Sequence, residues 1–145
     1  MRTILFKAKR LDNGAWIEGI PIQSNIDGDD YKVYMYVDFT VKNVMELNSG
    51  HGHFGKCVEV NPESVCEFIG LLDKNGNNIF EGDIMEAWGG TEYNGMYEYN
   101  YTGCVIFNHG EFYINHKNRI CINFGNIENY VTIGNKFDNA ERLVF

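Results

Sequence analysis

Three groups of polar residues in this chain have spacings that could support chemistry. The first is Asp73, Asn75 and Asn77, which share the one-three-five spacing of a calcium-binding loop. Such a loop also requires glycine at its sixth position and a bidentate glutamate at its twelfth, and those positions hold Asn78 and Ile84. We therefore interpret these polar residues as turn formers that hydrogen-bond their own backbone.

The second group is His51, His53 and Cys57, which could present ligands to a metal ion. A zinc site requires three or four convergent ligands on a firm frame, and the glycine-rich segment around the two histidines supplies little rigidity. We interpret both as solvated loop residues, and we interpret His109 and His116 in predicted turns in the same way. No metal ion and no cofactor are expected.

The third group is Glu81 and Asp83, a pair of carboxylates beside an aromatic strand that superficially resembles the acid pair of a glycosidase. Catalysis of that kind needs one carboxyl with a raised pKa and a cleft that holds a sugar. Both residues fall instead at a predicted strand entrance, where carboxylates stay ionised and hydrated. The chain also lacks a Gly-x-Ser-x-Gly elbow, a phosphate-binding glycine loop and a dinucleotide fingerprint. We predict that the protein is not an enzyme and has no catalytic residues.

Four tyrosines are stronger candidates for a functional site than these polar groups. Tyr93, Tyr97, Tyr99 and Tyr101 lie in a polar insertion between two predicted strands. Exposed tyrosine is amphipathic, loses little side-chain entropy on binding and is favoured at recognition surfaces. Three interpretations stay open: a surface that binds another protein, a contact between copies of this chain in a homo-oligomer, and a cover over the outer wall of the barrel.

Short strands and tight turns must position these residues. Residues 31–41 alternate apolar and polar side chains, which is typical of a long strand. Asn13-Gly14 and Asn75-Gly76 are dipeptides that favour two-residue hairpin turns, and Gly110 favours a tight turn between residues 104–107 and 112–114. These patterns, with little helical periodicity, predict an all-β fold, as one barrel or as two fused small barrels.

The length and the cysteines set further limits. A chain of 145 residues suits a single domain spanning residues 1–145, with a possible subdomain seam within residues 48–60. No apolar segment approaches the length of a membrane span, and the first residues lack the apolar region of a secretory signal, so we expect the bacterial cytoplasm. The widely spaced Cys57, Cys66, Cys104 and Cys121 are expected to be reduced and buried.

The net charge of −8 disfavours nucleic acid as a partner, because phosphate backbones repel an acidic surface. An acidic surface instead suits a partner protein with a basic groove. The alternative function is binding of single-stranded nucleic acid, for which small barrels often present aromatic faces. It requires Arg2, Lys7, Lys9 and Arg10 to share one outer face with nearby aromatic residues.

Several segments together resemble the YopX family. The resemblance is strongest at Val60–Val65, at Phe68–Asp73 and at Glu81–Ile84, where the residues read Val-Asn-Pro-Glu-Ser-Val, Phe-Ile-Gly-Leu-Leu-Asp and Glu-Gly-Asp-Ile. Weaker matches are the opening Arg-Thr-Ile-Leu-Phe-Lys-Ala, Gly103–Phe107 with Phe112, Val131–Asn135 and Asn139–Leu143. Cys66-Glu67-Phe68 departs from the usual family pattern, and residues 27–57 and the tyrosine-rich insertion are not covered.

The resemblance implies a mostly β fold with the character of an SH3-like barrel. It also implies a protein carried by bacteriophages or prophages, with a molecular role that is unknown and with no catalytic residues to transfer. The expected partners are accordingly a host protein, a phage protein or a second copy of the chain.

Overall fold

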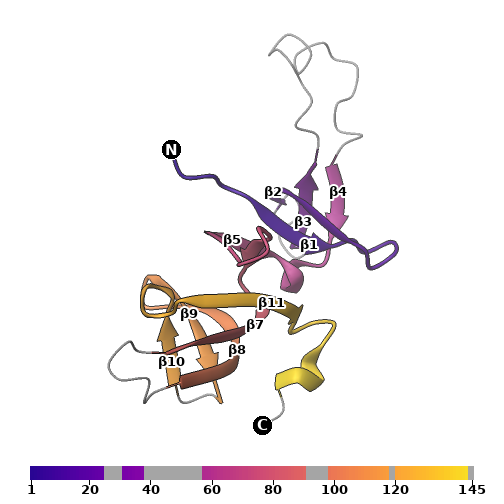
Figure 1. Ribbon diagram of the computed structural model, residues 1–145. Coiled ribbons are helices and arrows are strands. Elements are labelled where there is room, and N and C mark those ends of the chain that lie inside the picture. The colour runs from indigo at the N-terminus through magenta and orange to yellow at the C-terminus, as the bar shows by residue number, and fades with distance from the viewer. Residues whose placement is uncertain (25–30, 38–56, 91–97, 118–119, 144–145) are drawn as a thin grey trace. The chain divides into compact units, whose positions relative to one another are not determined.

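A computed structural model describes residues 1–24, 31–37, 57–90, 98–117 and 120–143, and within them the chain is built from strands and three short 3₁₀ turns (Figure 1). The strands are β1 (Phe6–Lys9), β2 (Trp16–Ser24), β3 (Lys32–Tyr36), β4 (Cys57–Val60), β5 (Cys66–Leu72), β6 (Asn78–Phe80), β7 (Asp83–Gly90), β8 (Glu98–Asn108), β9 (Glu111–His116), β10 (Ile120–Asn123) and β11 (Asn129–Asn135). The 3₁₀ turns are η2 (Pro62–Ser64), η3 (Phe124–Asn126) and η4 (Ala140–Leu143). The predicted all-β class is confirmed.

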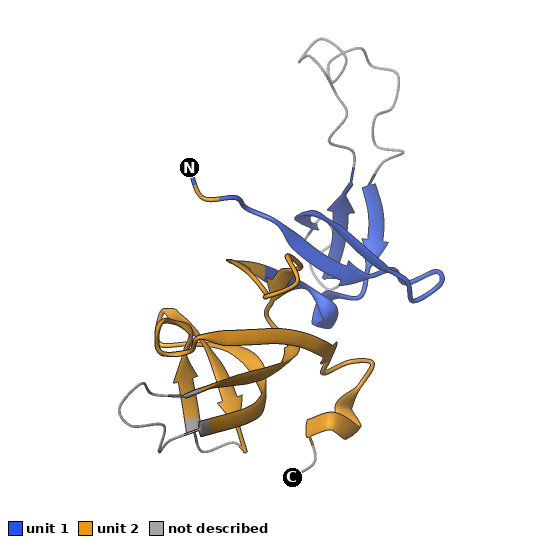
Figure 2. Ribbon diagram, viewed as in Figure 1, with its two compact units in different colours: residues 1, 3–67 blue, residues 2, 68–145 orange. Residues whose placement is uncertain are grey.

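The chain divides into two compact units, residues 1 and 3–67 and residues 2 and 68–145 (Figure 2). The division between Glu67 and Phe68 falls inside β5. Residues 48–56 of the seam expected within 48–60 lie outside the described residues, and Cys57–Val60 form β4 of the first unit. The seam within 48–60 therefore stays a prediction.

The first unit is an antiparallel sheet in which β4, β3, β2 and β1 are neighbours in that order, followed by the first residues of β5. The alternation predicted for residues 31–41 is seen in β3, where Val33 and Met35 are buried and the residues between them are not. These two side chains pack with Ala8 and Val60 in a small core. Residues 38–41 of the predicted strand lie outside the described part of the chain.

The second unit contains a five-stranded antiparallel sheet in the order β10, β9, β8, β7 and β11. The predicted hairpin between β8 and β9 is confirmed, because Asn108 pairs with Glu111 across a two-residue turn. Both turn residues have positive φ, 51° at His109 and 84° at Gly110, which is the conformation of a hairpin turn that follows the strand twist.

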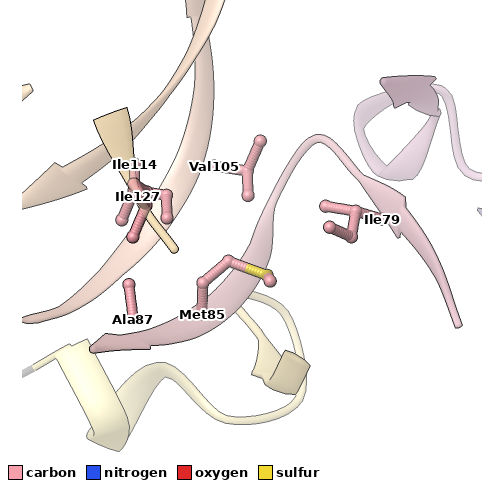
Figure 3. Close-up of a cluster of buried hydrophobic side chains, with 6 residues drawn as sticks. All are labelled: Ile79, Met85, Ala87, Val105, Ile114 and Ile127. Atoms are coloured by element: carbon pink, nitrogen blue, oxygen red, sulfur yellow. The ribbon is translucent and has the colours of Figure 1, made fainter. Parts of the chain in front are cut away.

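The core of the second unit lies on the face of this sheet that carries alternate residues of β7, β8 and β9. Figure 3 shows the side chains from these strands pointing toward one another, joined by Ile79 of β6 and by Ile127, which precedes β11. The six buried residues are Ile79, Met85, Ala87, Val105, Ile114 and Ile127. All six side chains are apolar, so hydrophobic burial is the main term that stabilises this unit.

Among the described strands, neither sheet closes into a barrel, which corrects the expected SH3-like barrel or pair of barrels. In the first unit, β4 meets the end of β1 through an isolated bridge between Arg10 and Val60. Two backbone bonds flank the bridge, from the Asn61 amide to the Lys9 carbonyl and from the Leu11 amide to the Glu59 carbonyl. In the second unit, closure would require a strand on the outer edge of β11. Residues of the turn after β5 occupy that edge instead.

The buried position of Ile114 gives a direct test of the second core. Ile114→Ala is expected to lower the free energy of unfolding by about 2–5 kcal/mol, because it removes a fully buried side chain and leaves a cavity. Leu11→Ala, at a side chain that is 56% exposed, should change it by less than about 0.5 kcal/mol. Denaturant unfolding measures both, and equal effects of the two substitutions would contradict the described core.

Candidate functional site

The carboxylate of Asp73 is buried, with 5% of the residue exposed, and it organises the turn between β5 and β6. One oxygen, Oδ1, accepts bonds from the amides of Asn75 and Asn77, each at 2.9 Å. The Asp73 amide in turn donates to the Asn77 carbonyl at 2.8 Å. The predicted turn-forming role of Asp73 is confirmed. The predicted two-residue turn at Asn75-Gly76 is wrong, because Leu72 pairs with Asn78 across five residues and only Gly76 of the pair has positive φ.

The same turn reaches across to β11. The second carboxylate oxygen of Asp73, Oδ2, accepts a bond from the Thr132 amide at 3.1 Å, and the Lys74 amide donates to the Tyr130 carbonyl at 2.9 Å. These two groups of β11 point away from β7, since strand backbone groups alternate in direction. The turn therefore takes the place of a neighbouring strand on the outer edge of β11.

Burial by itself would raise the pKa of Asp73. Hydrogen bonds from the amides of Asn77, Thr132 and Asn75 favour the ionised carboxylate more strongly, and the pKa lies below its usual value. Because both oxygens already accept protein donors, this carboxylate serves the fold and is a poor candidate for a proton donor at neutral pH.

Asp83, the second member of the suspected glycosidase pair, also serves the backbone. The residue is 2% exposed, and its Oδ2 accepts a bond from the Phe80 amide at 2.8 Å. Between the two acids, Gly82 has a φ of 85°, and its amide donates to the Val105 carbonyl. The pair thus stands at a backbone turn that joins β6 to β7, with one acid buried and with Glu81 half-buried.

Of the four tyrosines predicted to bind a partner, Tyr99 and Tyr101 lie on β8, whereas Tyr93 and Tyr97 lie outside the described residues. The rings of Tyr99 and Tyr101 stack with centroids 5.5 Å apart and planes 20° from parallel. Tyr99 packs against the core of the second unit, and its hydroxyl accepts a bond from the Glu128 amide at 3.1 Å. These contacts give Tyr99 a structural role in the second unit.

Gly89 makes room for Tyr99. It pairs with Tyr99 across β7 and β8, and a β-carbon on Gly89 would lie 2.5 Å from the tyrosine hydroxyl. A larger residue at this position would displace the ring.

Tyr101 continues the stack toward His116, whose ring lies edge-on at 5.3 Å between centroids. His116 Nδ1 lies 2.7 Å from the carbonyl oxygen of Thr102 and must carry a proton to donate to it. We call Tyr99, Tyr101 and His116 the aromatic ladder. The interpretation of His116 as a loop residue is wrong, because it is the half-buried last residue of β9. The alternation of Phe112, Ile114 and His116 is the signal that would have placed it.

The family model described as YopX protein matches residues 6–144. The chain belongs to the YopX family. Among solved structures, the crystal structure of protein EF1440 from Enterococcus faecalis is similar, with a TM-score of 0.57 and 20% sequence identity over 99% of this chain and 100% of that one. At that identity the likeness concerns the fold alone. No curated protein matches the chain.

The basic residues of this YopX-family chain are partly brought together. The ammonium groups of Lys7 and Lys9 lie 5.0 and 5.4 Å from the ring centroid of Trp16. Arg10 instead forms an ion pair with Asp12, in which Arg10 Nε lies 2.8 Å from Asp12 Oδ1. Lys7 and Lys9 are thus brought together over an aromatic ring, whereas Arg10 is engaged by Asp12.

The four cysteines are free thiols with different exposure. Cys66 is buried, Cys57 and Cys104 are half-buried, and Cys121 is exposed, contrary to the expectation that all four are buried. Burial raises the pKa of Cys104. Within the described residues, no three histidine, cysteine or acidic side chains converge, and His51 and His53 lie outside them.

The Asp73 carboxylate predicts a particular dependence of stability on pH. Because its pKa is lower in the folded protein than the value of about 3.9 in an unfolded chain, its stabilising effect is complete above that pH and is lost as the pH falls through the folded pKa. Asp73→Asn should lower the free energy of unfolding by about 1–3 kcal/mol at neutral pH, since an amide nitrogen cannot accept the bonds of Oδ2. The difference in the free energy of unfolding between Asp73→Asn and the natural protein should become smaller in acid.

Urea unfolding at a series of pH values measures this difference. Glu128→Gln, at an exposed side chain, is the control and should show a small difference that does not depend on the Asp73 titration. A loss of stability in Asp73→Asn that stays constant down to the lowest pH would contradict the assignment.

Proposed function

We propose that this protein is a non-enzymatic binding or self-assembly module whose contact surface is centred on Tyr101. The observation that carries the proposal is the aromatic ladder, in which the ring of Tyr101 is half-buried and braced on two sides by Tyr99 and His116. A ring held in this way loses little entropy on binding, and tyrosine combines an apolar face with a polar tip.

Two further observations support a role in binding. Asp73 and Asp83, the acids that could suggest catalysis, are engaged by backbone amides. The net charge of −8 suits a partner with a basic surface. We propose as partner a host or phage protein, or a second copy of the chain.

The same proposal includes the origin of the protein and its cellular location. Membership of the YopX family supports a phage- or prophage-encoded origin and a site of action in the bacterial cytoplasm. Among the described residues, no helix combines the length and apolarity needed to cross a membrane.

Substitution of Tyr101 tests the proposed surface. Tyr101→Ala should weaken association with the partner or with a second copy by about tenfold or more, because truncating a central aromatic residue typically costs over 1.4 kcal/mol of binding energy. The matched control is Tyr113→Ala on β9, whose hydroxyl bonds to Glu111 and whose position opposite Ile106 places it on the other face of the sheet.

Sedimentation of the purified protein and affinity capture from host lysate, with both variants side by side, measure the effect. Monomeric behaviour together with capture that Tyr101→Ala does not change would contradict the proposal. Circular dichroism of the variants establishes that each is folded.

One observation favours a second candidate, binding of single-stranded nucleic acid. Lys7 and Lys9 lie on the same face of β1 as Trp16 of β2, and cations beside an aromatic ring are the usual elements of such a site. Glu18, opposite Lys7, and the engagement of Arg10 by Asp12 weaken the positive potential of this face.

The second candidate predicts that a single-stranded oligonucleotide changes the tryptophan fluorescence at low salt. Lys7→Gln/Lys9→Gln should weaken the binding by roughly tenfold, because fewer counterions are released, while Lys32→Gln/Lys117→Gln removes the same charge elsewhere and should weaken it less. Equal losses for the two double variants would mean that binding depends on net charge and not on this face.

A further inference from the structure

The two edges of the sheet in the second unit differ. On β11, the Tyr130 carbonyl and the Thr132 amide are occupied by the turn that contains Asp73 and Lys74. At the other end of the sheet, β10 pairs with β9 and has no further neighbour among the described strands (Figure 1). In the described part of the chain, one edge is thus occupied and the other is open.

The open edge lacks three of the features that keep sheet edges apart in other proteins. These are charged residues, proline and a β-bulge. The sequence of β10 is Ile-Cys-Ile-Asn, which contains neither charge nor proline, and its register with β9 is unbroken. Strands of this kind readily add a further strand through their backbone groups.

The side chains of β10 are suited to extension of the sheet. Ile122 lies in a row with Ile114 and Val105 and packs against the core of the unit. Cys121 lies on the opposite face, in a row with Asn115 and Cys104, and is exposed. An added strand with the same alternation would continue both faces.

We propose that two copies of the chain associate by pairing β10 with β10 in antiparallel fashion about a twofold axis, so that one continuous sheet crosses both copies. This inference deepens the proposed self-assembly and rests on it. A second copy supplies a strand of the same alternation, and a twofold contact uses the same surface on both partners.

The charge of the strand does not oppose this arrangement. Because residues 120–123 are uncharged, antiparallel pairing of two copies brings no like charges of β10 together.

The pleat of the strand limits the register. Because residues that face each other across an antiparallel pair lie on the same face of the sheet, Cys121 must oppose either Cys121 or Asn123 of the second copy. The two Cys121 β-carbons would be about 5 Å apart in the first register and about 7–8 Å apart in the second. Either spacing lies within reach of a short cross-linker with two thiol-reactive groups.

Cross-linking of the full-length protein with a short bismaleimide tests the proposal. A covalent dimer should form through Cys121, at least about tenfold faster than in Cys121→Ser/Gln23→Cys, because groups held within a complex react at a raised effective concentration. That variant carries a thiol at an exposed site in the first unit and reports random collision. Cys121→Ser alone reports the reaction of the other cysteines.

Sedimentation over a series of concentrations supplies the second measurement. Cys121→Ser should keep the self-association, whereas Cys121→Asp should abolish it by placing like charges across the twofold axis. Gln23→Glu carries an added charge at an exposed site of the first unit and should behave like the natural protein. Melting temperatures of all variants show whether each is folded.

The outcomes separate this inference from the proposed function. Cross-linking through Cys121 no faster than in the collision control, or dimers that Cys121→Asp leaves unchanged, would overturn the β10 contact. A dimer lost in Tyr101→Ala but kept in Cys121→Asp would overturn the contact and leave the proposed function standing.

Discussion

The second unit depends on the bonds that the Asp73 carboxylate accepts from backbone amides. A buried carboxylate is costly unless donors replace the lost water, and here Asn75, Asn77 and Thr132 supply them. The bonds close a turn and at the same time hold that turn along the outer edge of β11. The turn held by Asp73 thereby occupies the edge at which a further strand would pair. Its position explains why the sheet ends at β11 and does not continue into a closed barrel.

The same use of polar groups recurs at other turns. Asp83 accepts from the Phe80 amide, Asn61 caps η2 through the Glu63 amide, and Asn123 caps η3 through the Gly125 amide. Groups that stabilise turns in this way are held by backbone donors and have little freedom to act on a substrate. This arrangement directs attention to surfaces: the aromatic ladder, where Tyr101 is braced by its neighbours, and the open edge of β10.

Local patterns in the sequence predicted local structure well and distant contacts poorly. The His109-Gly110 turn, the alternation in β3, the all-β class and the YopX resemblance each depend on residues close together in the chain. The bond from Thr132 to Asp73 joins residues 59 positions apart, and the pairing of Tyr99 with Gly89 depends on which strands become neighbours. Alternation shows which residues share a face but not what covers that face or edge. For that reason the sequence did not predict three features of the structure: the open sheets, the strand position of His116 and the exposure of Cys121.

Native-state hydrogen exchange at the Thr132 amide tests the role of Asp73 most directly. This amide points away from β7, so its protection depends on the Asp73 carboxylate and not on the sheet itself. In the natural protein at neutral pH the Thr132 amide should exchange slowly, and in Asp73→Ala it should exchange much faster while the Val105 and Ile114 amides of the central strands stay protected. Fast exchange at Thr132 in the natural protein, or slow exchange that survives in Asp73→Ala, would contradict the account.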